Sequence, residues 1–77
     1  MKEYVLCLIY DKVADLYSAP MLFDNESVAV RYFSNILEKT QNKGDYELYF
    51  IANYSDKTGI IYNIDKKLLL KGGSLNE

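Results

Sequence analysis

The sequence predicts an α+β domain in which one amphipathic helix packs on one face of an antiparallel sheet of four or five strands. Two apolar segments come first, a helix-like segment follows, and two or three further apolar segments complete the chain. This ββαββ order is typical of a sheet that carries its helix on one side. With 77 residues, the chain is expected to form a single domain (residues 1–77) near the lower size limit for independent folding.

Two strands are predicted before the helix. Residues 3–10 (EYVLCLIY) are rich in β-branched and aromatic side chains and apolar on both faces. This strand is therefore expected to be central and covered on both sides, or to be covered by a partner. Residues 16–23 (LYSAPMLF) contain the only proline, Pro20. Because proline has no N–H to donate, it is expected at an edge strand or a bulge, where it discourages pairing with strands of other molecules.

The helix is predicted within residues 24–40 (DNESVAVRYFSNILEKT), with Asp24 or Asn25 as its N-cap. Apolar side chains recur in pairs every four residues, which traces one stripe of a helix with 3.6 residues per turn. The predicted stripe is Val28, Ala29, Tyr32, Phe33, Ile36 and Leu37.

The strands predicted after the helix are residues 46–54 and 60–65, with a possible fifth at residues 68–70. Gly59 is expected to supply a positive φ in the turn at residues 55–59. Residues 72–77 are expected to form a flexible tail. Alternation in the third strand predicts one face with Leu48, Phe50 and Ala52, and the other with Glu47, Tyr49, Ile51 and Asn53.

A single helix covers only one side of such a sheet, so a second face bearing Tyr49, Ile51 and other rings would remain open. This face is expected to be either a dimer interface or a binding platform. Cys7 is the only cysteine, which excludes an internal disulfide, and the chain is 49% apolar with eight tyrosines. These features favour a homo-oligomer, in particular a dimer.

Composition narrows the classes of function. Nine basic and eleven acidic residues give a net charge of −2, which argues against a protein that coats duplex DNA but leaves single strands possible. There is no histidine, and the aspartates show no convergent spacing, so no metal, cofactor or enzymatic activity is expected. The apolar start of the chain is too short to span a bilayer and lacks a signal-peptide pattern, which predicts a cytoplasmic protein without membrane contact.

Three segments carry a resemblance to a known family: YSAP at 17–20, AVRYF at 29–33 and ELYFIANYSDKTG at 47–59. Together they resemble the small non-structural protein of gokushoviruses, single-stranded DNA phages of the microvirus group. The resemblance implies an accessory protein made in the cytoplasm of the infected bacterium and absent from the finished particle. It implies a role in single-stranded genome synthesis or packaging, through DNA or through viral or host replication proteins, and it transfers no functional residues.

Chemistry alone nominates residues for single-stranded DNA binding, which requires rings for base stacking and cations for phosphates. The candidates are Tyr10, Lys12, Tyr17, Arg31, Tyr49, Tyr54, Lys57, Tyr62, Lys66 and Lys67. Most have a structural alternative: the tyrosines suit β-strand packing, Lys66 and Lys67 suit a charged sheet edge that discourages aggregation, and Arg31 suits a solvated helix face. The competing function is a protein-interaction module that regulates replication proteins without touching DNA.

Overall fold

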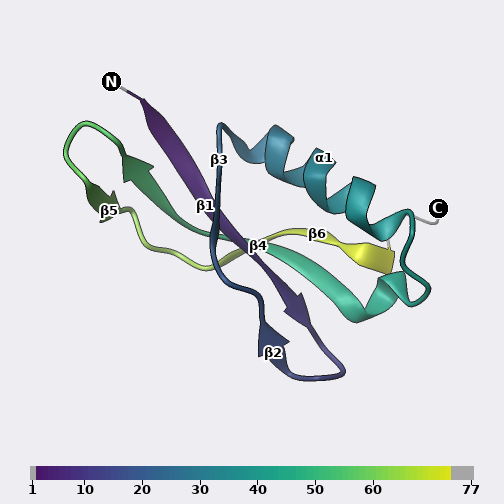
Figure 1. Ribbon diagram of the computed structural model, residues 1–77. Helices are drawn as coiled ribbons and strands as arrows, with labels where there is room; N and C mark the ends of the chain where they lie inside the picture. The colour runs from purple at the N-terminus through teal and green to yellow at the C-terminus, as the bar shows by residue number, and fades with distance from the viewer. Residues whose placement is uncertain (1, 74–77) are drawn as a thin grey trace.

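A computed structural model describes residues 2–73 of the chain (Figure 1). The strands and helices, in chain order, are β1 (Glu3–Asp11), β2 (Leu16–Tyr17), β3 (Met21–Phe23), α1 (Glu26–Leu37), the 3-10 helix η1 (Lys43–Asp45), β4 (Tyr46–Ser55), β5 (Ile60–Tyr62) and β6 (Lys67–Lys71).

All strand pairs are antiparallel, and the strands form one curled sheet in the order β2-β1-β4-β5 (Figure 1). β3 also pairs with β1, and β6 also pairs with β4. The sheet therefore has two long central strands flanked by two outer rows, β2–β3 and β5–β6. The α+β class is confirmed, but the prediction of four or five strands in ββαββ order is corrected to six strands in the described residues, because both outer rows are interrupted.

Each interruption has a local cause. Pro20 lies between β2 and β3 at the edge beside β1, as expected of a residue that has no N–H. Asn63 follows β5 with a φ of 54°, a left-handed conformation that ends the regular strand geometry. Gly59 has a φ of 72° in the β4–β5 turn, as predicted.

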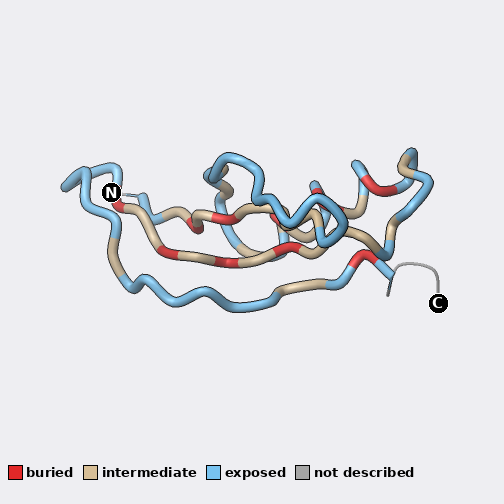
Figure 2. The backbone as a smooth tube through the Cα atoms, turned by 90° about the horizontal axis from the view of Figure 1, so that it is seen from below, coloured by how far each residue is buried: buried red, intermediate tan, exposed pale blue. Residues whose placement is uncertain are grey.

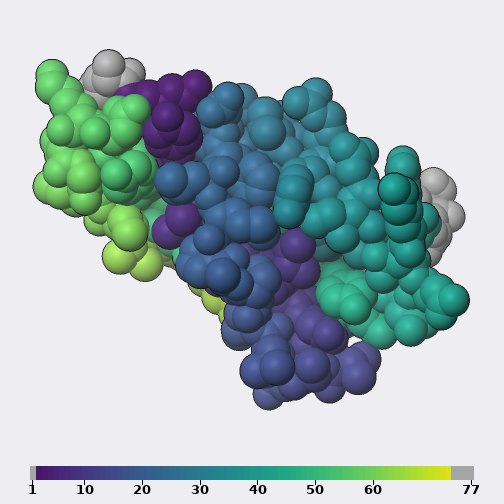
Figure 3. Space-filling model, viewed as in Figure 1, coloured from purple at the N-terminus to yellow at the C-terminus, as the bar shows by residue number. Residues whose placement is uncertain are grey.

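Helix α1 begins at its predicted cap: the Asn25 side chain accepts a hydrogen bond from the Val28 N–H at 2.9 Å. Its buried side chains are Ala29, Phe33 and Leu37, whereas Tyr32 and Ile36 are 41% and 40% exposed. The predicted stripe is therefore too wide on one side. Tyr32 lies at the helix margin, with its ring 5.2 Å from that of Phe23. Figure 3 shows the side chains of β3 and α1 packed together over the middle of β1.

The core lies between α1 and one face of the central strands. Its buried members are Val5, Cys7, Ala29, Phe33, Leu37, Leu48 and Phe50. Figure 2 shows buried positions along β1 and β4, while most of the β5–β6 row is exposed. Burial raises the pKa of the Cys7 thiol to about 11, so Cys7 stays protonated at neutral pH and acts as a small apolar side chain.

A β-bulge in β4 changes which side chains face the core. Cys7 pairs with Phe50, but its neighbour Leu6 pairs with Ala52, which leaves Ile51 as the extra residue. Paired side chains lie on the same face, so Phe50 and Ala52 lie on opposite faces. The prediction that Leu48, Phe50 and Ala52 share one face is wrong for Ala52, because simple alternation does not include a bulge.

The end of β6 packs against η1 through a glycine. Gly72, within the segment expected to be a tail, is buried, and a Cβ at this position would collide with the Lys43 carbonyl oxygen of η1. It would also lie 2.8 Å from the Tyr46 carbonyl oxygen and 3.0 Å from Leu37 Cδ1. Residues 74–77 of the expected tail lie outside the described residues.

We therefore expect Gly72→Ala to destabilise the fold by about 1–3 kcal/mol, because backbone rather than a flexible side chain blocks the added methyl group. Urea unfolding followed by circular dichroism measures the change. Gly44→Ala is the control, since a Cβ there meets nothing within 4 Å. Equal midpoints for the two variants would contradict this packing.

Candidate functional site

The face of the sheet opposite the core, here called the open face, carries five tyrosines. Val5 and Cys7 point into the core, so Tyr4, Leu6, Leu8 and Tyr10 point to the open face. Their cross-strand partners lie on that face as well: Tyr54 pairs with Tyr4, Tyr49 with Leu8, and Tyr17 with Tyr10. The bulge at Ile51 brings Tyr49 and Tyr54 to the same face although they are five residues apart.

Three of these tyrosines surround one lysine, in a group here called the tyrosine–lysine cluster (Tyr10, Tyr17, Tyr49 and Lys66). The Tyr17 ring centroid lies 4.5 Å from that of Tyr10 and 6.5 Å from that of Tyr49. Lys66 Nζ lies 4.3, 4.7 and 5.9 Å from the ring centroids of Tyr17, Tyr49 and Tyr10. It also donates a hydrogen bond to the Tyr17 hydroxyl. These distances allow cation–π attraction to all three rings.

The hydroxyls of two cluster tyrosines donate to carboxylates. Tyr10 donates to Asp15, and Tyr49 donates to Glu47 at 2.8 Å. The hydrogen bond to Asp15 raises the pKa of Tyr10 to about 12, and the bond to Glu47 raises the pKa of Tyr49. Both hydroxyls therefore stay protonated at neutral pH, and the carboxylates fix the orientation of the rings.

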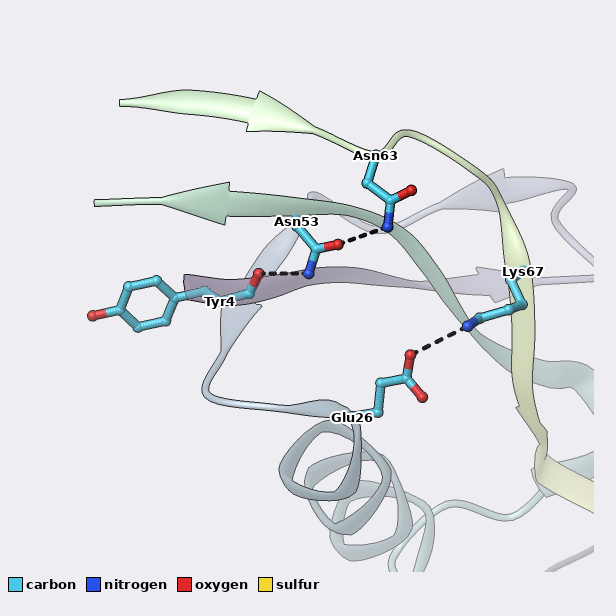
Figure 4. Close-up of polar contacts among 5 residues, drawn as sticks. All are labelled: Tyr4, Glu26, Asn53, Asn63 and Lys67. Atoms are coloured by element: carbon cyan, nitrogen blue, oxygen red, sulfur yellow. Dashed lines mark hydrogen bonds and ion pairs between the residues drawn. The ribbon is translucent and has the colours of Figure 1, made fainter. Parts of the chain in front are cut away.

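Lys66 is positioned by the linker between β5 and β6. The Asp65 N–H donates to the Ile51 carbonyl at 2.9 Å. Asn63 donates through Nδ2 to Asn53 Oδ1 at 2.9 Å, and Asn53 donates to the Tyr4 carbonyl at 3.3 Å (Figure 4). The first two bonds attach the linker to β4, and the third joins the same Asn53 to β1, so Lys66 approaches the cluster from an anchored segment.

A second aromatic group lies on the open face near the start of β1. The rings of Tyr4 and Tyr54 lie 6.2 Å apart, and Lys2 Nζ lies 5.6 Å from the Tyr4 centroid. Exposed aliphatic side chains lie beside both groups: Leu22 opposite Leu6, Leu68 opposite Tyr49, and Ile61 opposite Tyr54. The expected second apolar, ring-bearing face is therefore present.

Comparison with known proteins identifies the family. A family model described as Phage ORF5 protein matches residues 4–75, which is nearly the whole chain. The chain belongs to the Phage ORF5 family. No curated protein and no solved structure matches it. It is thus a small phage protein. Within residues 2–73 of this Phage ORF5 family member, no helix is long and apolar enough to cross a membrane.

The nominated residues of the Phage ORF5 chain separate into two sets. Tyr10, Tyr17, Tyr49 and Lys66 form the cluster, and Tyr54 lies on the same face. Sequence reasoning missed Tyr4 and Lys2. The signal for Tyr4 was its position six residues before Tyr10, which places both on one face of a regular strand.

The other nominated residues lie away from the cluster. Tyr62 pairs with Asn53, which pairs with Val5, so Tyr62 lies on the core side, where its hydroxyl donates to Glu3. Lys67 forms an ion pair with Glu26 at 3.3 Å (Figure 4). Arg31 is exposed on α1, Lys12 on the turn after β1, and Lys57 on the β4–β5 turn. None of them contributes to the cluster in this structure, and no three acidic or cysteine side chains among the described residues gather as a metal site.

The hydrogen bonds to carboxylates predict distinct tyrosine titrations. Asp15→Asn should lower the pKa of Tyr10 from about 12 toward the ordinary value of about 10, because ionised Tyr10 would no longer face a negative charge. NMR of the tyrosine ring carbons against pH measures the shift. Glu3→Gln is the matched control, since it should lower the pKa of Tyr62 and leave Tyr10 unchanged. If the pKa of Tyr10 stayed the same in the Asp15→Asn variant, the hydrogen bond between Tyr10 and Asp15 would be contradicted.

Proposed function

We propose that this protein is a non-enzymatic accessory factor of a gokushovirus-like phage that binds single-stranded DNA in the cytoplasm of the infected bacterium. Its binding surface is the open face, and its role lies in genome synthesis or packaging. The observation that supports this proposal best is the tyrosine–lysine cluster, which combines three rings with a cation on an uncovered sheet.

Stacking is the main expected source of affinity. Tyr17 is 46% exposed, so part of its ring is available to a base. A base stacked on an aromatic side chain contributes about 1–3 kcal/mol, largely independent of its identity. Tyr4 and Tyr10 are six residues apart on β1, which corresponds to roughly 20 Å along a strand. The open face is thus long enough to contact several nucleotides, with one aromatic group near each end.

Phosphate neutralisation is expected to be a small part of the affinity. Lys66 and Lys2 are the cations that lie over open-face rings in the described residues, and Lys2 would have to exchange its ion pair with Asp24, at 3.3 Å, for a phosphate. Asp15 and Glu47 border the cluster with negative charge. Each phosphate neutralised on a single strand changes the salt slope by about −0.7. Two such contacts would produce a slope near −1.4, which is shallow for a DNA-binding protein.

Tyr17→Ala should weaken binding of a single-stranded oligonucleotide by roughly 5- to 150-fold, the equivalent of one stacked base. Fluorescence anisotropy at low salt measures the affinity. Tyr32→Ala is the matched control, because Tyr32 has a similar exposure of 41% but lies on α1, away from the open face. If both variants bind like the wild type, or lose affinity equally, the open face is not the binding surface.

Lys66→Gln should reduce the salt dependence of oligonucleotide binding, because one phosphate contact is removed. The slope of the logarithm of the binding constant against the logarithm of the salt concentration should become shallower by about 0.7. Anisotropy titrations at several salt concentrations measure this slope. Lys39→Gln, at an exposed position after α1, should leave it unchanged. A wild-type slope in Lys66→Gln would exclude the proposed contact between Lys66 and a phosphate.

The exposed aliphatic side chains of the open face support a second candidate function, a module that regulates viral or host replication proteins through protein contacts alone. Leu22, Leu68 and Ile61 offer apolar area that DNA does not need. The absence of oligonucleotide binding at low salt would reject the first proposal and favour this one.

A further inference from the structure

Lys71, the last residue of β6, is a cation of the open face outside the tyrosine–lysine cluster. It pairs with Glu47 across the β4–β6 ladder, and Glu47 pairs in turn with Tyr10. Because paired side chains lie on the same face of a sheet, Lys71 shares the open face with Tyr10. Its neighbour Leu70 packs against the core, which agrees with an outward Lys71.

A phosphate would not have to displace a carboxylate partner from Lys71. The side chain is exposed, and within residues 2–73 it forms no ion pair, although Glu47 lies opposite. Glu47 instead accepts a hydrogen bond from the Tyr49 hydroxyl at 2.8 Å. Lys67, on the same strand, is a contrast, because it lies on the core side of the sheet and is paired with Glu26 at 3.3 Å.

Lys71 and Lys2 lie near opposite ends of the open face. Lys71 is level with Tyr10 near the end of β1, whereas Lys2 directly precedes Glu3, where β1 begins. Lys2 comes eight residues before Tyr10, which corresponds to roughly 26 Å along a strand. Most of the length of the sheet therefore separates the two lysines.

Between these two ends, rings and a further cation follow one another along the strands. The tyrosine–lysine cluster lies next to Lys71, and the second aromatic group lies next to Lys2. The backbone of Lys66 lies beside the middle of β4, because the neighbouring Asp65 N–H donates to the Ile51 carbonyl. The open face thus carries a cation at each end and one in the middle, with an aromatic group in each interval.

Proteins that bind single strands combine cations that follow the phosphates with rings on which successive bases stack. We propose that a single strand of DNA lies lengthwise on the open face, parallel to β1 and β4, with Lys71 as a third phosphate contact. This inference rests on the proposed function, to which it adds a binding residue and the direction of the bound strand.

A strand that crossed the sheet would meet fewer suitable groups. The line of side chains across the sheet at Tyr10 consists of Tyr17, Tyr10, Glu47 and Lys71, so its one lysine lies beside a carboxylate that repels phosphates. The shape of the molecule also favours the lengthwise path. The Cα trace extends 40 Å in its longest direction and 22 Å in the next, and the ten residues of β4 alone cover roughly 33 Å.

The first test measures the salt dependence of oligonucleotide binding by anisotropy. With three phosphate contacts of about −0.7 each, the wild-type slope should lie near −2.1, and Lys71→Gln should make it shallower by about 0.7. Lys67→Gln is the matched control: Lys67 belongs to the same strand but lies on the core side, so its variant should keep the wild-type slope.

The outcomes separate this inference from the proposed function on which it rests. If Lys71→Gln keeps the wild-type slope while Tyr17→Ala still weakens binding, the third contact is overturned and the proposed function stands. If the wild type binds no oligonucleotide at low salt, both are overturned.

The second test addresses the direction of the strand with a nitroxide spin label on an oligonucleotide long enough to span the open face. Labels at the 5′ end and at the 3′ end should broaden amide NMR signals at opposite ends of the long strands, one near Asp11 and Tyr46 and the other near Glu3 and Ser55. Two labels that both leave Glu3 and Ser55 sharp, or that broaden the whole sheet evenly, would overturn the lengthwise path.

Discussion

The antiparallel pairing of β1 with β4 is the interaction on which the rest of the structure depends. These two strands are paired from Glu3 with Ser55 to Asp11 with Tyr46, and every other strand is attached to one of them. Their inward side chains form the surface on which α1 packs, and their outward side chains include four of the five tyrosines of the open face. Since about 35 residues separate the strands along the chain, this pairing is non-local, and its formation is expected to limit the rate of folding.

Much of this fold could be predicted because local patterns agree with it. The alternation in β1, the Asn25 cap and the positive φ of Gly59 each reflect a single segment, and each is found where expected. The bulge at Ile51 could not be predicted, because it arises from the register between two distant strands. The broken outer rows depend in the same way on where each short strand meets its neighbour. The margin of the helix stripe, where Tyr32 and Ile36 are exposed, depends on the limited width of the sheet beneath α1.

The candidate site was less predictable than the fold. Tyr10 and Tyr49 could be assigned to the open face from period-two alternation, but Tyr54 reached it only through the bulge. Tyr62 on β5 and Lys67 on β6 had suitable chemistry but lie on the core side of the sheet. The side on which each residue lies follows from the register of its strand with β4, which the sequence of the strand itself does not show. Residue type alone does not distinguish the nominated residues on the open face from those away from it, since both groups contain tyrosines and lysines that contact carboxylates or rings.

The four residues of the tyrosine–lysine cluster come from three separate parts of the chain, and this fixes the order in which they are synthesised. Tyr10 and Tyr17 belong to the first hairpin, Tyr49 to the second long strand, and Lys66 to the linker that leads into the last strand. A ribosome therefore releases the three rings before it releases the lysine. Until Lys66 has been added, a nascent chain carries these rings and the carboxylates of Asp15 and Glu47 without the cation that lies over the rings in the folded protein. Any activity that needs the rings and the cation together therefore begins only after β5 and the linker that follows it have been synthesised.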